Sequence, residues 1–327
     1  MNHRQHPIGS GFTASSTVED VMQGIDLSGR NAVVTGGHSG LGLQVTRALA
    51  RAGARVTIGA RDPDRAARAV EGIERVEVGR LDLIDPDSVD AFAARWRGTG
   101  RPLHILVNNA GHSASAEPVH DRRGYESQFA VNHLGHFQLT LALLPALRAA
   151  QGARVVNTTS GAQRLSDIRW DDPMFTEGVY DPGLAYAQSK TANVLFTVEL
   201  DRRWSGEGIR AYAPHPGVVA ATAFNSSVGP EQQRAQGLID DAGEPIIDPG
   251  RGKKTVEQGA ATIVFAATSP LLADVGGVYL NNCDVSELDD DQPPVTAEEI
   301  SAEVVSHSID PGSARRLWEL SERLLQA

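Results

Sequence analysis

The sequence predicts an α/β fold: one doubly wound domain with a mainly parallel, seven-stranded sheet and helices on both faces. From Asn31 onward, short β-branched runs alternate with Ala-, Leu- and Arg-rich stretches, an order typical of parallel strands joined by crossover helices. The β-branched runs are apolar at nearly every position, as expected of strands covered on both faces. Because this alternation covers most of the 327 residues, we expect a single domain over residues 16–327 rather than two.

Each element follows from local patterns within the alternation. The expected strands are, in order, Asn31–Thr35, Arg55–Ala60, Val76–Arg80, Leu103–Asn108, Arg154–Thr158, Gly208–Ala213 and Gly277–Leu280. The clearest helices are Leu41–Ala52, Pro63–Ile73, Leu184–Trp204 and Ala314–Leu325. Asp62 directly precedes Pro63, which predicts a helix N-cap followed by proline at the first helical position.

Three segments depart from the alternation. Residues 1–15 are polar and contain several Gly and Ser residues, so we expect them to be flexible. Residues 223–255 are rich in Gly, Pro, Gln and Asp without a clear period, which predicts a mobile flap over a substrate. Residues 284–327 form a C-terminal extension, and its first eight residues contain five acids. We expect a solvated loop there, because the spacing of the acids fits no cation-binding loop.

Composition argues against several classes of protein. The chain has 30 Lys and Arg against 41 Asp and Glu, a net charge of −11, which disfavours a nucleic-acid partner. Its one cysteine, Cys283, leaves no internal disulfide and no cysteine-rich zinc site. Neither an apolar signal-peptide core nor an apolar run of 18 residues occurs. We therefore expect a cytoplasmic protein without a transmembrane segment.

A glycine-rich turn joins the first strand to the first helix. Its sequence is Thr35-Gly36-Gly37-His38-Ser39-Gly40-Leu41-Gly42. The glycines at 36, 40 and 42 allow a sharp turn and a close approach to a pyrophosphate, whose charge would face the helix N-terminus. A turn that only connects strand to helix is the alternative, but its place at the first strand–helix junction favours nucleotide binding.

The tip of the second strand bears on the choice of nicotinamide cofactor. An acidic residue about 20 positions after the glycine turn often holds the ribose hydroxyls of NAD, and Asp62 lies there. We interpret Asp62 as a helix N-cap instead, because Pro63 follows it. Arg61 at the strand tip predicts a charge-assisted pair with a 2′-phosphate, so NADP is favoured over NAD. An ordinary surface arginine is the alternative.

Three side chains have the chemistry of a proton-transfer site. Tyr186 and Lys190 lie four residues apart on one face of a predicted helix. A tyrosine has an ordinary pKa near 10, and a neighbouring cation together with a positive nicotinamide ring would lower it. Ser160 follows a strand, at the sheet edge where open α/β folds bind ligands. An exposed Tyr/Lys pair and a helix-capping serine remain alternatives, and Thr159 is an alternative to Ser160.

In these motifs the chain resembles the short-chain dehydrogenase/reductase family, which has a Rossmann fold. Its motifs occur in family order: the glycine turn, Leu81-Asp82-Leu83, Asn108-Asn109-Ala110-Gly111, Asn132, Ser160, Tyr186-x-x-x-Lys190 and His215-Pro216-Gly217. Further segments are similar to the retinol-dehydrogenase-like branch that includes the WW-domain oxidoreductases: residues 24–29, 258–262, 277–283 and 317–322. No WW module is evident in the sequence.

The resemblance implies a role for each matched residue. Tyr186 would be the acid or base, Ser160 would hold the substrate oxygen, and Asn132 would fix a water through which Lys190 exchanges protons. Lys190 would also bind the cofactor ribose and lower the tyrosine pKa, while Asp82 would approach the adenine. The implied cofactor-binding set is Gly36, His38, Ser39, Gly40, Leu41, Gly42, Arg61, Asp82, Leu83, Asn109, Ala110, Gly111, Tyr186, Lys190, Pro216 and Gly217.

The implied activity is hydride transfer between NADP, with NAD as a second choice, and an alcohol or carbonyl of a hydrophobic small molecule. The resemblance also implies a homodimer through the helix that carries Tyr186, although the terminal segments here leave that open. A catalytically weak NADP sensor or scaffold is the alternative function. A sugar-nucleotide epimerase or dehydratase is disfavoured by the spacing of the glycines.

The remaining candidates are given structural interpretations. His133 and His136 lie three residues apart, and the sequence suggests no third metal ligand. We therefore expect both rings to have a structural packing role and to form no metal site. We expect His215 to shape a turn and Cys283 to be an inert, buried thiol. The loop Arg164–Gly183 is expected to shape the substrate entrance. Thr222 lies too far from Pro216 to be given a cofactor contact.

Overall fold

A computed structural model describes residues 5–112, 117–220, 229–291 and 302–326 of the chain. Its centre is a sheet of eight strands in the order β3-β2-β1-β4-β5-β6-β7-β8, parallel from β3 to β7. The strands are β1 (Asn31–Thr35), β2 (Arg55–Ala60), β3 (Val76–Arg80), β4 (Ile105–Asn108), β5 (Ala153–Asn157), β6 (Ile209–Pro214), β7 (Val278–Asn281) and β8 (Asp284–Val285).

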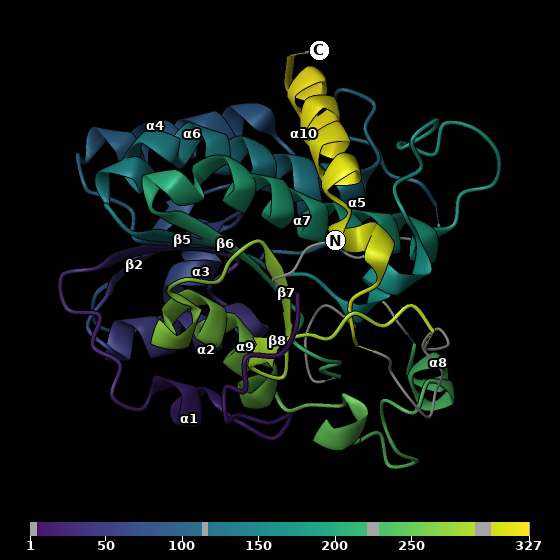
Figure 1. The fold of residues 1–327 in the computed structure, drawn as a ribbon, viewed down its shortest axis with the longest axis horizontal. Helices are drawn as coiled ribbons and strands as arrows, with labels where there is room; N and C mark the ends of the chain where they lie inside the picture. Colours follow the sequence, from purple (N-terminus) through teal and green to yellow (C-terminus); the bar gives the residue numbers. More distant parts are fainter. Residues whose placement is uncertain (1–4, 113–116, 221–228, 292–301, 327) are drawn as a thin grey trace.

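Helices cover both faces of the sheet, which confirms the doubly wound fold (Figure 1). They are α1 (Val18–Met22), α2 (Gly40–Arg51), α3 (Pro63–Ala69), α4 (Pro86–Gly98), α5 (Ser127–Phe129), α6 (Gly135–Ala149), α7 (Pro182–Trp204), α8 (Pro230–Ala235), α9 (Val256–Thr268) and α10 (Pro311–Gln326). One core lies between the sheet and α2, α9 and α1, and another between the sheet and α4, α6 and α7.

The predicted strand count of seven is wrong by one. All seven expected strands are present, but β8, only two residues long, pairs antiparallel with β7 at the sheet edge. A two-residue strand shows no periodicity in a sequence. Asp284 was expected in a solvated loop, yet it belongs to β8 and is only partly exposed, because its carboxylate accepts backbone hydrogen bonds from the N-terminal segment.

The N-terminal segment was expected to be flexible, but from residue 5 onward it packs along the same sheet edge. The side chain of Gln5 is buried, donates to the Tyr279 carbonyl at 3.0 Å and accepts from the Tyr279 amide at 3.0 Å. The amide of Ser10 donates to Asp284 at 2.9 Å. One glutamine thus satisfies backbone groups of β7 as another strand would, and a polar composition does not reveal such pairing.

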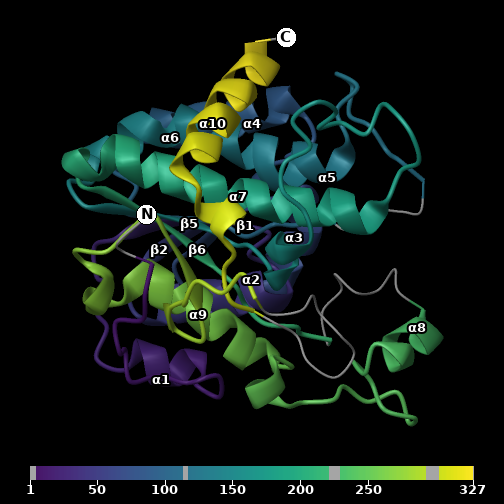
Figure 2. The same cartoon turned by 45° about the vertical axis from the view of Figure 1, so that its right-hand side comes forward.

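The C-terminal helix α10 lies across α7 on the outside of the helical layer (Figures 1 and 2). Trp318 of α10 is 2% exposed, and its ring centre lies 4.9 Å from that of Phe137, 5.9 Å from Phe196 and 5.4 Å from Trp204. The helix therefore completes the core formed by α6 and α7, and it covers part of the face through which a homodimer was expected.

The expected flap has regular structure where the chain is described. It includes α8, and Ile239 forms a β-bridge with Pro245, while Lys253 pairs with Val218. Thr222 lies outside the described residues. Among the described residues, no helix is both long and apolar enough to cross a bilayer.

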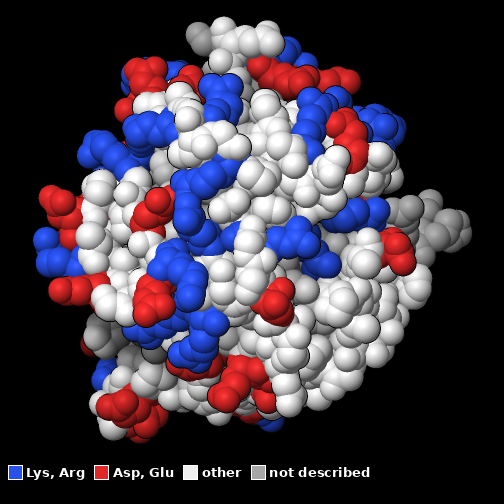
Figure 3. All heavy atoms as spheres, turned by 90° about the vertical axis from the view of Figure 1, so that its left-hand side faces the viewer, with Lys and Arg blue, Asp and Glu red and all other residues white. Residues whose placement is uncertain are grey.

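Charge is unevenly spread over the surface. Figure 3 shows one side of the molecule, where Lys and Arg side chains gather in a band although the whole chain carries a net charge of −11. Many of the arginines in residues 55–97 are exposed, among them Arg55, Arg75 and Arg95.

Candidate active site

The predicted site residues follow the carboxyl ends of neighbouring strands. β1 and β4 are adjacent at the point where the strand order reverses, and β5 and β6 come next. The glycine turn follows β1, Asn109 follows β4, Ser160 follows β5 and Pro216 follows β6. Ligands of open α/β sheets bind at such a reversal, so the topology alone gathers these residues at one edge.

Tyr186, Ser160 and Lys190 meet at this edge. Asp181 caps α7 by accepting from the amides of Gly183 and Leu184, which fixes the first turn of the helix ahead of Tyr186. Tyr186 is hydrogen-bonded to the Ser160 side chain. The ammonium of Lys190 lies 5.4 Å from the centre of the Tyr186 ring and donates to the Thr158 carbonyl at 3.3 Å.

Burial dominates the proton equilibria of this cluster. It raises the pKa of Tyr186 to about 12, against the opposing effect of the Ser160 hydrogen bond, and lowers the pKa of Lys190 to about 8. In the protein without a cofactor, desolvation of the phenol thus sets the tyrosine pKa, and the lowering expected from Lys190 together with a nicotinamide ring stays a prediction. The phenol is protonated at neutral pH, as a proton donor to a carbonyl must be.

Asn132 holds the backbone that follows β4. It lies in a π-helical turn, Ala130–Leu134, and its Oδ1 accepts from the amide of His112 at 2.8 Å. Its Nδ2 donates to the His112 carbonyl at 3.1 Å and to Ser189 at 3.0 Å. Both amide hydrogens are thus used by protein groups, and the side chain joins this segment to α7 beside Tyr186.

The glycine turn fits a nucleotide diphosphate. Gly36 and Gly40 have φ of 66° and 50°, and a Cβ on Gly42 would lie 2.4 Å from the Gly36 carbonyl. Ser39, the N-cap of the twelve-residue α2, makes no capping hydrogen bond with its side chain, so amides of the first turn remain available to an anion. The buried Nδ1 of His38 has no hydrogen-bond partner among the described residues.

The Thr35 hydroxyl joins the ends of β1 and β4 beneath this turn. It accepts from the amides of Asn109 and Ala110, both at 2.9 Å, and bonds to Nε2 of His136 at 2.9 Å. Asn109 also donates to the Thr35 carbonyl at 3.2 Å. Gly111 follows this junction. The start of the Asn-Asn-Ala-Gly motif is therefore bound to the end of β1, directly beside the glycine turn.

An exposed arginine follows the end of β2. Arg61 is exposed at the end of β2, and its carbonyl accepts from Arg80 at 3.4 Å. Asp62 caps α3 by accepting from the Arg65 amide at 3.0 Å, which confirms its structural interpretation. Burial lowers the pKa of His112, the charge of Glu126 opposes this effect, and the charge of Arg61 adds to it.

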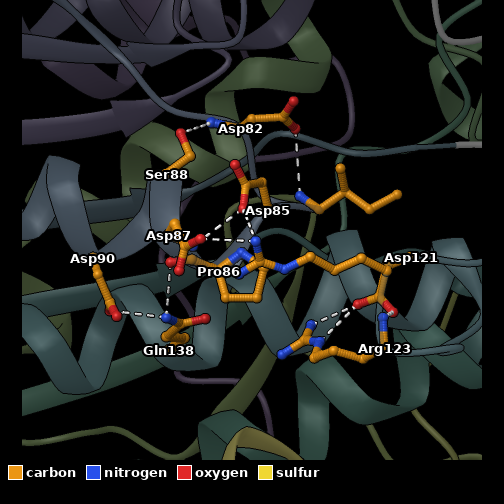
Figure 4. Close-up of polar contacts among 11 residues, drawn as sticks. Asp82, Asp85, Pro86, Asp87, Ser88, Asp90, Asp121, Arg123 and Gln138 are labelled. Atoms are coloured by element: carbon orange, nitrogen blue, oxygen red, sulfur yellow. Dashed lines mark hydrogen bonds and ion pairs between the residues drawn. The ribbon is translucent and has the colours of Figure 1, made fainter.

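Asp82 lies on the turn between β3 and α4 (Figure 4). Its amide donates to Ser88 at 2.9 Å, and its carboxylate accepts from the Ile84 amide at 3.4 Å. Figure 4 shows the acids of this turn and Asp121, whose carboxylate binds Arg123 at 2.7 Å. Leu83 is buried and packs under Gly135, where a Cβ would lie 2.4 Å from the Leu83 carbonyl.

Pro216 and Gly217 follow the carboxyl end of β6, at the same edge of the sheet. Gly217 has a φ of 79°, and a Cβ there would lie 2.9 Å from both the Gly252 carbonyl and Cδ of Lys254. Lys254 is 2% exposed, and its ammonium donates to Asn282 at 2.6 Å. The burial of Lys254 could not be predicted from the sequence, because Lys253-Lys254 before a helix cap has the pattern of a solvated surface.

The two histidines of the Asn-His-Leu-Gly-His segment are buried in the protein core. His133 bonds to Ser321 of α10 at 2.7 Å, and Nδ1 of His136 bonds to the Asn132 carbonyl at 3.1 Å. Burial lowers the pKa of His133 to about 3 and that of His136 to about 4, so both are neutral. Cys283 is 1% exposed, and burial raises its pKa to about 11, which fits an inert thiol.

Comparison with known proteins decides the family. The model of the short chain dehydrogenase family matches residues 30–233, which contain the glycine turn, Ser160, Tyr186 and Lys190. The chain belongs to the short-chain dehydrogenase family. This short-chain dehydrogenase is an NAD(P)-dependent oxidoreductase by membership, which confirms the enzyme class and the Rossmann-like fold expected from its motifs.

Its relatives confirm the expected branch. The short-chain dehydrogenase is 45% identical to a "Probable oxidoreductase" of Streptomyces lividans over 93% of its own length and 100% of the relative's. It is 38% identical to "Retinol dehydrogenase 12" of Bos taurus, covering 79% of each chain. Among solved structures, "Pseudomonas aeruginosa RhlG/NADP active-site complex" matches with a TM-score of 0.59 and 28% identity, over 78% of this chain and 95% of that one.

Proposed function

We propose that this short-chain dehydrogenase uses NADP to interconvert an alcohol and a carbonyl of a hydrophobic small molecule, with Tyr186 as acid and base. The observation that carries the proposal is the hydrogen-bonded pair of Tyr186 and Ser160, with the Lys190 ammonium 5.4 Å from the tyrosine ring centre. A proton donor and a hydroxyl acceptor or donor are what a substrate oxygen needs as its charge changes.

The chain's own residues supply orientation and proton transfer. Ser160 holds the substrate oxygen, and the Tyr186 hydroxyl gives it a proton during reduction, whereas the Tyr186 phenolate takes the proton back during oxidation. Lys190 binds the ribose hydroxyls and stabilises the phenolate that reduction leaves behind. The nicotinamide, when bound, supplies the hydride. Asn132 keeps the segment after β4 against α7, so that the Tyr186 helix has a fixed neighbour.

Arg61 supports NADP over NAD. Its guanidinium is exposed at the end of β2, while Asp62 is committed to capping α3 and offers no ribose-binding carboxylate. The solved structure of RhlG contains NADP, which is consistent with this choice. Apolar residues near the site support a hydrophobic substrate: Leu165 is 42% exposed five residues after Ser160, and Leu184 is 38% exposed two residues before Tyr186.

The test of the acid–base role is Tyr186→Phe, assayed by NADPH oxidation with a panel of apolar ketones and aldehydes. We expect kcat to fall by about 10²–10⁴-fold, because the ring remains and only the transferable proton is lost. NADPH affinity, measured by fluorescence titration, should stay within about twofold. Tyr125→Phe is the matched control, since its hydroxyl donates to the Leu324 carbonyl instead. Near-normal turnover of Tyr186→Phe would remove the tyrosine from the mechanism.

The test of cofactor choice is Arg61→Ala, titrated with NADPH and NADH. Loss of a charge-assisted contact should weaken NADPH binding by about ten- to a hundredfold and leave NADH binding nearly unchanged. Arg75→Ala, an exposed arginine paired with Glu74, is the control. Equal affinity of the unmodified enzyme for the two cofactors would contradict the proposal.

A further inference from the structure

His215, at the end of β6, is buried and anchored from two sides. Its amide donates to the Leu280 carbonyl of β7 at 2.8 Å. Its ring is 2% exposed and stacks on Tyr279, with ring centres 6.3 Å apart and an interplanar angle of 20°. The Tyr279 hydroxyl in turn donates to the Ala302 carbonyl at 2.7 Å. The imidazole therefore has little freedom to move.

One nitrogen of this ring has a specific partner. The amide of Gly161 donates to Nδ1 of His215 at 3.1 Å. Because Nδ1 accepts, the neutral ring carries its hydrogen on Nε2, and that buried nitrogen has no hydrogen-bond partner among the described residues. An apolar ring would pack against Tyr279 without leaving a polar atom unsatisfied, so packing alone does not account for a histidine. What the imidazole adds is the acceptor for Gly161.

That acceptor controls the backbone of Ser160. On one side of Ser160, the Thr159 amide donates to the Pro214 carbonyl at 3.0 Å, and on the other the Gly161 amide donates to His215. Pro214 and His215, at the end of β6, thus bind the amides of the residues on either side of Ser160. The hydroxyl of Ser160 is bonded to Tyr186 and accepts from the Ala162 amide at 3.2 Å, so its position depends on this turn.

The surroundings keep the ring neutral. Burial, together with the ammonium groups of Lys254 and Lys190, lowers the pKa of His215 to about 3. Its acceptor lone pair is therefore present at every pH at which the enzyme is assayed. The ring has no part in proton transfer, in agreement with the interpretation of His215 as a turn-shaping residue.

We propose that His215 is a positioning residue that fixes the Ser160 hydroxyl toward Tyr186 through the Gly161 amide. This inference rests on the proposed function, since it matters only if Ser160 holds the substrate oxygen. A misplacement of about 1 Å at a reacting centre costs on the order of a hundredfold in rate. Losing the Gly161 contact should therefore act on turnover rather than on cofactor binding.

The experiment is a double-mutant cycle with His215→Phe, Ser160→Ala and both together. We expect His215→Phe to lower kcat/KM for an apolar ketone by about 10–100-fold, with NADPH affinity within about twofold. The double variant should be no slower than Ser160→Ala alone, because the histidine has no other route to the chemistry. His215→Asn, whose side-chain carbonyl supplies an acceptor, should recover part of the lost rate.

Three outcomes would overturn the inference: losses that multiply in the double variant, no recovery with His215→Asn, or weakened NADPH binding in step with the loss of rate. If Phe prevents folding, His215→Met, which also lacks a strong acceptor, replaces it in the cycle. Full activity of Ser160→Ala is a different result, because it contradicts the proposed role of Ser160 itself.

Discussion

At the scale of single residues, the site is built from cations that the protein has removed from water. Lys190 is 4% exposed and Lys254 2%, and burial lowers the pKa of each to about 8. The Lys190 ammonium donates to the Thr158 carbonyl, and the Lys254 ammonium donates to the side-chain amide oxygen of Asn282. Burying such charges lowers the stability of the folded protein, but it leaves the cations able to attract an anionic cofactor.

Lys190→Met should therefore stabilise the folded enzyme while damaging its function. Below pH 8 the folded state carries a buried charge that the unfolded state solvates freely, so stability is reduced there. The penalty disappears as the pH rises from about 8 toward the ordinary lysine value of 10.5. We expect a gain of about 1–3 kcal/mol at pH 7, after loss of the Thr158 hydrogen bond, and a smaller one at pH 9.5. Urea unfolding at both values measures it.

Arg97→Met, at an exposed position on α4, is the control and should show no such dependence on pH. A gain for Lys190→Met that is equal at pH 7 and pH 9.5 would show that the buried charge is not its cause. NADPH titration of the same variant should show weaker binding, because the ribose contact is lost.

At the scale of elements, strands and their loops were predictable from sequence, and long-range polar pairing was not. β1, β2 and β3 have the expected bounds, since apolar β-branched runs end at Gly, Asp or Arg. The expected helix from Pro63 to Ile73 ends earlier, at Ala69, and Gly72 follows with a φ of 80°. The part played by Gln5 at the sheet edge depends on partners more than 270 residues away, which no local pattern contains.

The same division holds for the candidate site. The glycine turn, Ser160, Tyr186 and Lys190 were found because their spacing is local or their strand ends are neighbours. The burial of Lys254 could not be predicted, because it depends on the Gly217 turn folding over this side chain. The rise in the pKa of Tyr186 without cofactor could not be predicted for a related reason: a sequence shows the nearby lysine but not the protein that excludes water.

Gly42→Ala tests how tightly the first turn of α2 is packed. The new methyl group would lie 2.4 Å from the Gly36 carbonyl and 2.7 Å from Nδ2 of Asn109. We expect a loss of about 1–3 kcal/mol in stability and weaker NADPH binding, because the turn must open to admit it. Gly98→Ala in α4 meets nothing within 4 Å and should instead stabilise by about 0.5–1 kcal/mol. Equal effects of the two substitutions would contradict this packing.

At the scale of the whole molecule, buried neutral histidines join the layers. His133, in the π-helical turn Ala130–Leu134, links this turn to α10 through Ser321, His136 links α6 to β1 through Thr35, and His215 links the end of β6 to the Ser160 turn. Their pKa values are about 3, about 4 and about 3, all lowered by burial. The core of the enzyme therefore depends on rings that must remain uncharged.

Stability should consequently fall as the medium becomes acidic. These histidines have depressed pKa values in the folded state, so their contribution is complete above the unfolded value of about 6.5 and declines as the pH drops toward 4. At pH 5 each should cost about 2 kcal/mol relative to pH 7.5. Urea midpoints at the two values measure the sum, and His133→Phe should lower the dependence by about a third. An unchanged midpoint at pH 5 would show that the rings are hydrated in solution.

The position of Trp318 has a consequence for synthesis on the ribosome. The aromatic rings of α6 and α7 are covered by a helix that begins at Pro311, more than a hundred residues after α7 ends. Even when the nascent chain has formed every strand, Phe137 and Phe196 still lack their contacts with Trp318. The growing polypeptide therefore exposes an apolar surface until α10 has been synthesised, and chaperones that bind such surfaces would find it there.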